Sequence, residues 1–229
     1  IYPSHRAELF AARVAKDGTL LDPDRIRVAS APDPSFPYRA DAPAVAFDGS
    51  QYIVAWADNR GAGTSVEMAY SAAGYSTQIN DEGRVDEAKP FTPPGAMGVR
   101  SLSLTKCPTG ALVAWDQWER RDIPEPTLRI ATLRSSSTLV GETKVVEGAA
   151  FPSLTTDGTG FLLGYVSNAA LSTTAQNAVA PIGPDLTLGS SRSFARDSTT
   201  DVAWDGDRYV VLNRGRVQRT AADGTSISE

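Results

Sequence analysis

Apolar and polar residues alternate along short stretches of this chain, and a tight polar turn joins each such stretch to a second, more apolar one. This shape recurs in four segments, at 43–56, 101–115, 152–165 and 200–213. Alternation with a period of two is typical of β-strands that bury one face. In three of the four segments the turn contains Asp-Gly, and glycine accepts the positive φ that tight hairpin turns require. The pattern therefore predicts four β-hairpins, which we call inner hairpins.

A second kind of hairpin, the outer hairpin, alternates with the first. It is clear at 10–21, 69–85 and 216–227 and weaker at 128–140 and 177–188. One hairpin of each kind makes a four-stranded antiparallel unit.

The turns of the inner hairpins recur at intervals of 59, 50 and 48 residues, at Asp48, Cys107, Asp157 and Asp205. Repeats of this length built from short strands are typical of propeller blades. We therefore expect an all-β fold, a β-propeller of four-stranded antiparallel blades. About four to five blades fit the chain, and an incomplete part of a larger ring is the alternative to a closed one.

The residues of these repeats carry a resemblance to a known class of protein. Residues 43–56 read Pro-x-Val-Ala-x-Asp-Gly-x-x-Tyr-x-Val-x-Trp, and residues 12–21 read Ala-Arg-Val-x-x-Asp-Gly-x-Leu-Leu. The two patterns resemble the blade repeat of secreted bacterial β-propeller proteins, most closely at 9–60 and 198–225. The resemblance implies the propeller fold and a secreted or cell-surface location in a bacterium. It implies no particular activity, because propellers host many functions.

The hairpins divide the chain unevenly. We expect a single domain over 1–229, with a half-blade at about 8–29 followed by blades at about 43–88, 99–147, 150–195 and 198–229. The half-blade is an outer hairpin without an inner one, so one face of its sheet is predicted to be open. Four apolar side chains would line that face: Phe10, Val14, Leu20 and Leu21. We expect missing upstream sequence or another chain to cover it, so the expected partner is another protein chain or a further copy of this one.

The composition argues against several classes of function. A net charge of −5 and a pI near 5.0 argue against a nucleic-acid partner, because proteins that bind nucleic acids carry a basic face. Cys107 is the only cysteine, so no internal disulfide forms. The single histidine, His5, excludes His-rich zinc sites and disfavours a Ser-His-Asp triad. No apolar stretch reaches the roughly 18 residues of a membrane-spanning helix, and nothing in the sequence implies a cofactor.

The connections after the second and fourth strands of each blade are expected to lie on one face and to carry the binding site. They span 31–43, 57–65, 90–99, 116–127 and 167–175. Trp side chains there are flanked by charged and amide residues. Such a set suits a carbohydrate, because a sugar ring stacks on an indole and its hydroxyl groups bond to polar side chains. The predicted ligand-binding residues are Asp58, Arg60, Trp115, Asp116, Trp118 and Arg120.

A purely structural role is the alternative for some of these residues. Trp56 and Trp115 occupy equivalent positions of the repeat, which favours packing between blades, with Asp58–Arg60 and Glu119–Arg121 as surface ion pairs. Trp118 differs, because no other repeat has a Trp at that position. We therefore single out Trp118 as the predicted ligand contact.

Carboxylates on the same connections leave an enzymatic alternative open. A glycosidase needs two carboxyl groups ~5 or ~6.5–9.5 Å apart, and the candidates are Asp58, Asp116 and Glu119. No motif ties them together, so the preferred interpretation assigns no catalytic residue. A calcium site would need six to eight converging oxygens. The turn aspartates stand nearly alone apart from the pairs Asp205/Asp207 and Asp22/Asp24, so no metal site is predicted.

The sequence thus favours an extracellular binding or structural module over an enzyme, with carbohydrate as a candidate ligand. Two alternatives stay open: a glycoside-acting hydrolase that uses the loop carboxylates, and an assembly subunit that packs through open blade edges.

Overall fold

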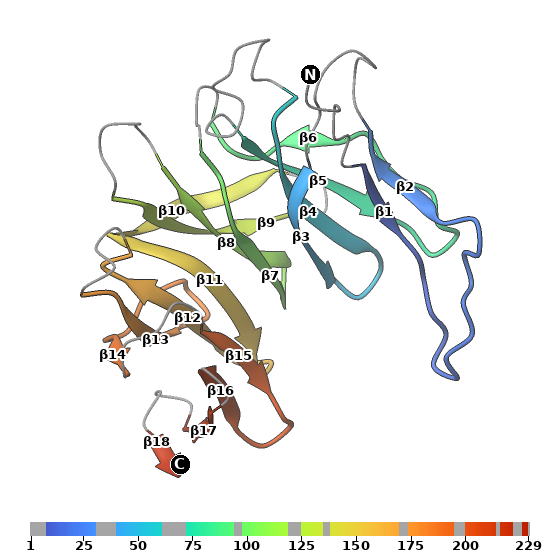
Figure 1. Ribbon diagram of the computed structural model, residues 1–229. Helices are drawn as coiled ribbons and strands as arrows, with labels where there is room; N and C mark the ends of the chain where they lie inside the picture. The colour runs from blue at the N-terminus through green and yellow to red at the C-terminus, as the bar shows by residue number, and fades with distance from the viewer. Residues whose placement is uncertain are drawn as a thin grey trace.

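Figure 1 shows a computed structural model of the chain, which describes residues 8–30, 40–60, 72–93, 98–118, 125–134, 138–169, 174–194, 200–213, 216–221 and 226–228. These residues form strands and turns and contain no helix, and accordingly no helix among them is long and apolar enough to cross a membrane. The paired strands run antiparallel. The predicted all-β antiparallel fold is confirmed.

The described strands assemble into one two-stranded and four four-stranded sheets. The two-stranded sheet consists of β1 (Leu9–Ala11) and β2 (Ile26–Ala29). The first four-stranded sheet consists of β3 (Ala40–Phe47), β4 (Tyr52–Asp58), β5 (Ala73–Ile79) and β6 (Lys89–Pro90). The second consists of β7 (Leu102–Cys107), β8 (Gly110–Gln117), β9 (Thr127–Leu133) and β10 (Leu139–Glu147). The third consists of β11 (Ala149–Thr156), β12 (Phe161–Ser167), β13 (Gln176–Ile182) and β14 (Arg192–Ser193). The fourth consists of β15 (Asp201–Trp204), β16 (Tyr209–Asn213), β17 (Arg216–Thr220) and β18 (Ser226–Ser228).

The sheets follow one another round an arc, from β1 and β2 in blue to β15–β18 in red (Figure 1). Within each four-stranded sheet the strands pair in chain order. The first strands lie side by side, because β3 contacts β7, β7 contacts β11 and β11 contacts β15. Consecutive antiparallel sheets with their first strands innermost have the architecture of a β-propeller.

Three inner hairpins turn at an Asp-Gly pair in the same way. Oδ1 of Asp48 accepts hydrogen bonds from the N–H groups of Ser50 (2.7 Å) and Gln51 (2.8 Å). Asp157 and Asp205 accept the same two bonds, at 2.7 to 2.9 Å, from the residues two and three positions on. The glycines that follow have φ of 113°, 94° and 101°, a region that side chains disfavour. These carboxylates therefore close turns, as the Asp-Gly pattern indicates.

The outer hairpins share a marker of their own. Past the regular pairing, a single bridge joins Val14 to Leu20, Ile79 to Val85 and Ile182 to Leu188. The β1–β2 hairpin carries the first of these bridges, and the β5–β6 and β13–β14 hairpins carry the others. The two-stranded sheet is thus built like the outer half of a four-stranded one.

The hydrophobic core lies between successive sheets. One cluster joins the β3–β6 and β7–β10 sheets and contains Ile53, Ala55, Leu104 and Trp115. A second joins the β7–β10 and β11–β14 sheets through Leu112, Ile130, Leu154 and Leu163. A third joins the last two sheets through Leu162, Val179, Val202 and Val211. Each sheet therefore buries its faces against its neighbours in the arc.

The alternation in the sequence predicts a core that the structure confirms in most positions: Ile53, Val54, Leu102, Leu104, Leu112, Val113, Leu154, Leu162, Val202, Tyr209 and Val211 are buried. Burial was wrongly predicted for Val45 and Phe47, which are exposed, and Trp204 is only partly buried. Val45 and Phe47 lie on the side of β3 that faces the two-stranded sheet, where no inner hairpin covers them. The predicted exposure of Phe10, Val14, Leu20 and Leu21 is confirmed.

Candidate functional site

The connections after the second and fourth strands of each sheet leave from the same end of the strands, and we call that end the loop face. Two groups of described side chains lie there, at the ends of β4 and β8. Glu119 and Arg120 lie outside the described residues, so their predicted roles stay predictions. Asp58 and Asp116 belong to strands and not to loops, because β4 extends to Asp58 and β8 extends to Gln117.

The first group is centred on Asp58, whose side chain is fully buried. Its Oδ2 accepts hydrogen bonds from Nε1 of Trp56 (2.9 Å) and Nε of Arg60 (2.8 Å), and Nη2 of Arg60 lies 2.6 Å away. Its Oδ1 accepts the backbone N–H of Arg60 at 2.7 Å. A buried carboxylate is stable when it is paired and hydrogen-bonded in this way. Asp58 thus fixes the indole of Trp56 and the guanidinium of Arg60 at the end of β4.

Arg60 also covers two aromatic rings. Its guanidinium carbon lies 4.5 Å from the ring centroid of Tyr75 and 5.8 Å from that of Trp56, and the two rings are stacked 6.3 Å apart. Burial, followed by the nearby charge of Asp58, raises the pKa of the Tyr75 hydroxyl. Arg60 is partly exposed, whereas Trp56 is fully buried. The four side chains of this group therefore contact one another, and Arg60 and Tyr75 are the two that are partly exposed.

Trp115 lies in the interior. It is buried in the cluster between the β3–β6 and β7–β10 sheets and meets Phe91 edge to face, with ring centroids 5.4 Å apart. The contact matches the packing role that its position in the repeat predicts. The assignment of Trp115 as a ligand contact stays a prediction, and in this conformation the indole has almost no exposed surface.

Asp116 joins the β7–β10 sheet to the next one. The carboxylate is fully buried. Oδ1 accepts the N–H groups of Arg100 (3.1 Å) and Ser101 (2.9 Å), and Oδ2 accepts the Ser101 hydroxyl (2.5 Å) and the N–H of Phe151 (3.2 Å). Phe151 has a φ of 56°, in the left-handed region, where β11 departs from regular pairing. Asp116 therefore holds the start of both β7 and β11.

The second group on the loop face consists of Trp118 and Arg100. The guanidinium carbon of Arg100 lies 4.1 Å from the centroid of the Trp118 ring, well within the range of a cation–π interaction. The backbone N–H of Trp118 bonds to the carbonyl of Gly98 at 3.3 Å. Gly98 has a φ of 81°, and a Cβ there would lie 2.6 Å from the carbonyl oxygen of Trp118. Glycine is therefore required for this close approach.

Trp118 is partly buried, and within the described part of the chain its Nε1 has no hydrogen-bond partner. Sequence reasoning singled out Trp118 and missed Arg100. The available signal was the position of Arg100 in the connection before β7, which leaves from the same face as the connection that follows β8. A cation and an indole on adjoining connections make a stacking surface.

The candidate catalytic carboxylates are engaged elsewhere. Asp58 and Asp116 are both buried, and each accepts several hydrogen bonds from its own surroundings. In the described ranges no group of three or more His, Cys, Asp or Glu side chains converges in the manner of a metal site. Asp58 and Asp116 thus act as acceptors that hold the ends of β4 and β8 in place.

Comparisons with known proteins show the fold. No protein-family model matches the sequence, and no curated protein is similar to it in sequence. The α-L-arabinofuranosidase of Lactobacillus brevis matches with a TM-score of 0.56 over 90% of this chain and 72% of that one, at 12% identity. The GH43_1 enzyme of Xanthomonas citri matches with a TM-score of 0.54 over 79% and 69%, at 13% identity.

The haemagglutinin-neuraminidase ectodomain of parainfluenza virus 5 has a TM-score of 0.59 over 89% of this chain, at 11% identity. The chain spans 56% of that ectodomain. At such identities the similarity establishes a shared β-propeller architecture and not a shared activity.

Proposed function

We propose that this chain is an extracellular carbohydrate-binding propeller module, with Trp118 and Arg100 at the centre of its contact surface. The observation that carries the proposal is the position of the Arg100 guanidinium, 4.1 Å from the centroid of the Trp118 ring on the loop face. A stacked guanidinium fixes the orientation of an indole, and a preorganised ring loses less entropy when a ligand binds.

Carbohydrate fits the chemistry of this pair. The apolar face of a sugar ring stacks on an indole, and its hydroxyl groups accept hydrogen bonds from a guanidinium. The similar structures named above as an arabinofuranosidase and a neuraminidase are named for action on sugars, which supports the same class of ligand.

Glycoside hydrolysis is the second candidate. It is favoured by the names of the same structures and by the carboxylates on this face. Binding ranks above it because Asp58 and Asp116 are committed to internal hydrogen bonds. Glu119 is the remaining candidate and would supply one of the two carboxyl groups that hydrolysis needs, so Glu119→Gln should abolish any release of reducing sugar.

A comparison of two Trp118 variants tests the binding proposal. Wild-type protein, Trp118→Ala and Trp118→Phe are applied to an array of immobilised oligosaccharides and titrated by calorimetry with the best ligand. We expect Trp118→Ala to weaken binding at least tenfold, about 1.4 kcal/mol, while Trp118→Phe retains most of the affinity. Trp204→Ala is the matched control, because Trp204 lies next to an Asp-Gly turn at the opposite end of the strands. Equal binding by wild type and Trp118→Ala, or equal loss in Trp204→Ala, would contradict the proposal.

A further inference from the structure

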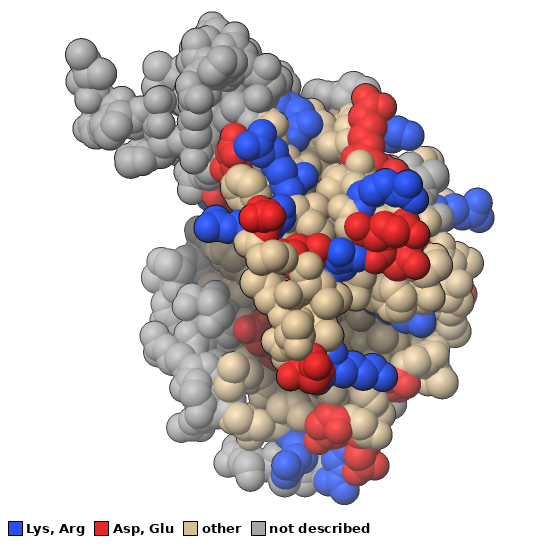
Figure 2. Space-filling view, turned by 90° about the vertical axis from the view of Figure 1, so that its right-hand side faces the viewer, with Lys and Arg blue, Asp and Glu red and all other residues tan. Residues whose placement is uncertain are grey.

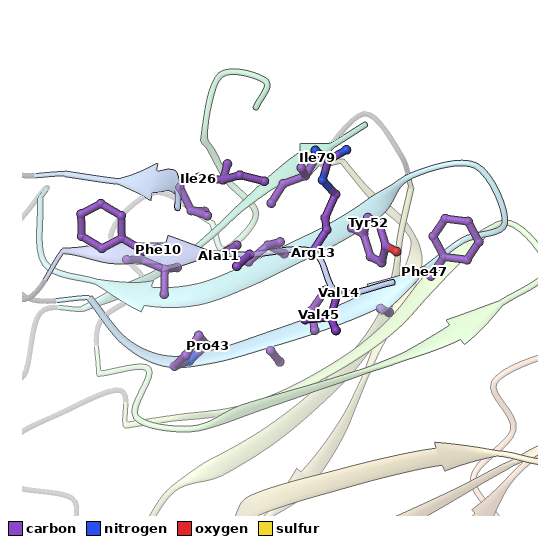
Figure 3. Close-up of a pocket in the computed structure, with 16 residues that line it drawn as sticks. Phe10, Ala11, Arg13, Val14, Ile26, Pro43, Val45, Phe47, Tyr52 and Ile79 are labelled. Carbon is purple, nitrogen blue, oxygen red and sulfur yellow. The ribbon is translucent and has the colours of Figure 1, made fainter. Parts of the chain in front are cut away.

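The two-stranded sheet packs against the β3–β6 sheet through a buried cluster that includes Val28, Val54 and Trp56. An apolar groove of about 600 Å³ lies between the two sheets beside this cluster. Figure 3 shows that Phe10 of β1 and Val14, just beyond β1, lie on one side of the groove. Side chains of β3 and β4 lie on the other side, among them Val45, Phe47 and Tyr52. Figure 2 views the molecule from the side that carries β1 and β2, where uncharged residues lie between groups of Lys, Arg, Asp and Glu. Exposed apolar side chains are unfavourable in water, so an element that covered them would be stabilised by their burial.

The internal repeat shows what normally fills this place. Val45 is 59% exposed, whereas the residues at its position in the next three sheets, Leu104, Leu154 and Val202, are 7–8% exposed. Each of these three packs against the sheet that precedes it in the chain. Val45 differs from them because the sheet before it has only its outer half.

The exposed fraction of Tyr52 on β4 also differs from that of its equivalents in the other sheets. Tyr52 is 37% exposed, whereas its equivalents Ala111, Phe161 and Tyr209 are at most 5% exposed. Tyr52 and Val45 therefore lack the same packing partner, although they lie on different strands. The missing element must reach both β3 and β4, as an inner hairpin does at the other interfaces.

Hydrogen bonds identify the position more closely. The N–H of Leu154 donates to Oγ of Ser103 (3.0 Å), and the N–H of Val202 donates to Oγ of Ser153 (3.1 Å). In both cases a serine on one first strand bonds to the backbone of the next first strand. Val45 occupies the corresponding donor position on β3, so a hydroxyl side chain opposite it would extend the pattern of these two interfaces. At the interface between β3 and β7 the serine position is occupied by Ala44.

The edge of the two-stranded sheet points to the same element. In the four-stranded sheets the third strand pairs on both sides, as β5 pairs with β4 and β6. β1 occupies the place of a third strand, and in the described residues it pairs with β2 alone. An open strand edge beside an apolar face is a template for added strands.

We propose that this groove binds a fifth inner hairpin, whose second strand pairs with β1 and whose first strand lies beside β3. Its chemistry follows from the inner hairpins present here: an alternating first strand with an aliphatic residue, a serine as on β7 and β11, an Asp-Gly turn as in three of the four, and an apolar second strand. A second folded copy of the chain is a poor occupant, because its inner hairpins are already paired within four-stranded sheets.

A peptide tests the proposal directly. A fluorescently labelled peptide of residues 149–167 contains the β11–β12 hairpin and the Ser153 hydroxyl, and it is titrated against the whole chain. We expect saturable binding that Val45→Asp weakens at least tenfold. Leu212→Asp is the matched control, since Leu212 is also an exposed aliphatic residue on a strand but lies on β16, and it should leave binding unchanged. Amide hydrogen exchange at Val45 and in β1 should slow when the peptide binds.

Other results would overturn the proposal. Isolated hairpins are marginally stable, so the peptide is tested both linear and cyclised through a disulfide, and failure of both forms to bind refutes it. Equal binding to wild type and Val45→Asp refutes it as well, and so does equal weakening by Leu212→Asp. A wild-type dimer that Val45→Asp converts to a monomer in sedimentation velocity would show that a second copy occupies the groove instead.

Discussion

Oδ2 of Asp116, on β8, accepts the backbone N–H of Phe151, on β11, at 3.2 Å. The bond crosses from one sheet to the next and ends at a residue with left-handed backbone geometry. The same carboxylate also accepts the hydroxyl of Ser101, at the start of its own sheet. One buried side chain thus sets the position of two neighbouring first strands.

Asp116→Ala should therefore destabilise the protein. It would remove the acceptor of the Ser101 and Phe151 N–H groups, whose hydrogen bonds are partly buried, and each such loss costs up to about 1–3 kcal/mol. We expect a decrease of roughly 2–4 kcal/mol in the free energy of unfolding, measured by urea denaturation followed by circular dichroism. Asp86→Ala, at an exposed aspartate, is the control and should change stability by less than about 0.5 kcal/mol. A similar small effect at Asp116 would show that water replaces the carboxylate without penalty.

Val45 and Val54 make a second, sharper comparison, because they are directly opposite each other on β3 and β4. Val54 is buried and Val45 is exposed. Val54→Asp buries a charge with no partner and should unfold at least the β3–β6 sheet. Val45→Asp should leave the fold intact. Thermal melting by circular dichroism distinguishes the two, and similar melting temperatures for both variants would contradict the strand register.

We expect acid to destabilise the β1–β2 hairpin selectively. The side chain of Arg13 bonds to Asp22, and the Arg13 backbone N–H bonds to it as well, and together they lower the pKa of the Asp22 carboxyl to about 2. Because this folded-state pKa lies below the unfolded value of about 3.9, the ion pair stabilises the hairpin fully above about pH 5. Its contribution is lost as the pH falls from about 4 through 2.

Amide exchange in β1 and β2, measured from pH 5 to pH 2, checks this expectation, after correction for the intrinsic pH dependence of exchange. Protection there should fall in wild type and be low and constant in Asp22→Asn. Arg13 also donates to the carbonyl of Asp81, so part of the order in this hairpin should persist at low pH. A pKa near 4 for Asp22 in an NMR titration would rule out the ion pair as the cause.

Two glycines with positive φ should differ in their tolerance of alanine. Gly110 has a φ of 142°, and a Cβ there would lie 2.4 Å from the carbonyl oxygen of Leu133. Gly206 has a φ of 101°, but nothing lies within 4 Å of its Cβ position. Gly206→Ala should cost about 1–3 kcal/mol through backbone strain alone. Gly110→Ala should lower the melting temperature further, and equal shifts would show that the backbone of β9 moves to make room.

Local patterns predicted the fold well. Alternation and Asp-Gly turns depend on residues close together in the chain, and Asp48 and Asp157 close their turns with neighbours two and three positions on. Alternation also marks Val45 as a core residue, since it has the same pattern as Leu104. Val45 is exposed because, among the described residues, the neighbouring two-stranded sheet has no inner hairpin to cover it, and no local pattern reports that.

The candidate site was harder to predict because its partners are distant in sequence. Trp118 stood out as an addition to the repeat, but Arg100, 18 positions earlier, meets it only once two connections converge on one face. The bonds of Asp58 are local, since its donors Trp56 and Arg60 lie two positions away, and the sequence alone predicts the Asp58–Arg60 pair as an alternative. The burial of Asp116 depends on donors that local spacing does not reveal, such as the N–H of Phe151.

The serine bonds that run from Ser103 to Leu154 and from Ser153 to Val202 all point in one direction along the chain. The β7–β10 and β11–β14 sheets each provide the next sheet with a hydroxyl acceptor and an apolar face, so neighbouring sheets stabilise each other as they do in a linear array of repeats. Sheets in the middle of such an array have two supporting neighbours, and those at its ends have one. Opening should therefore begin at the β1–β2 hairpin and at the β15–β18 sheet and travel inward, and the β7–β10 and β11–β14 sheets should hold their amide protons longest.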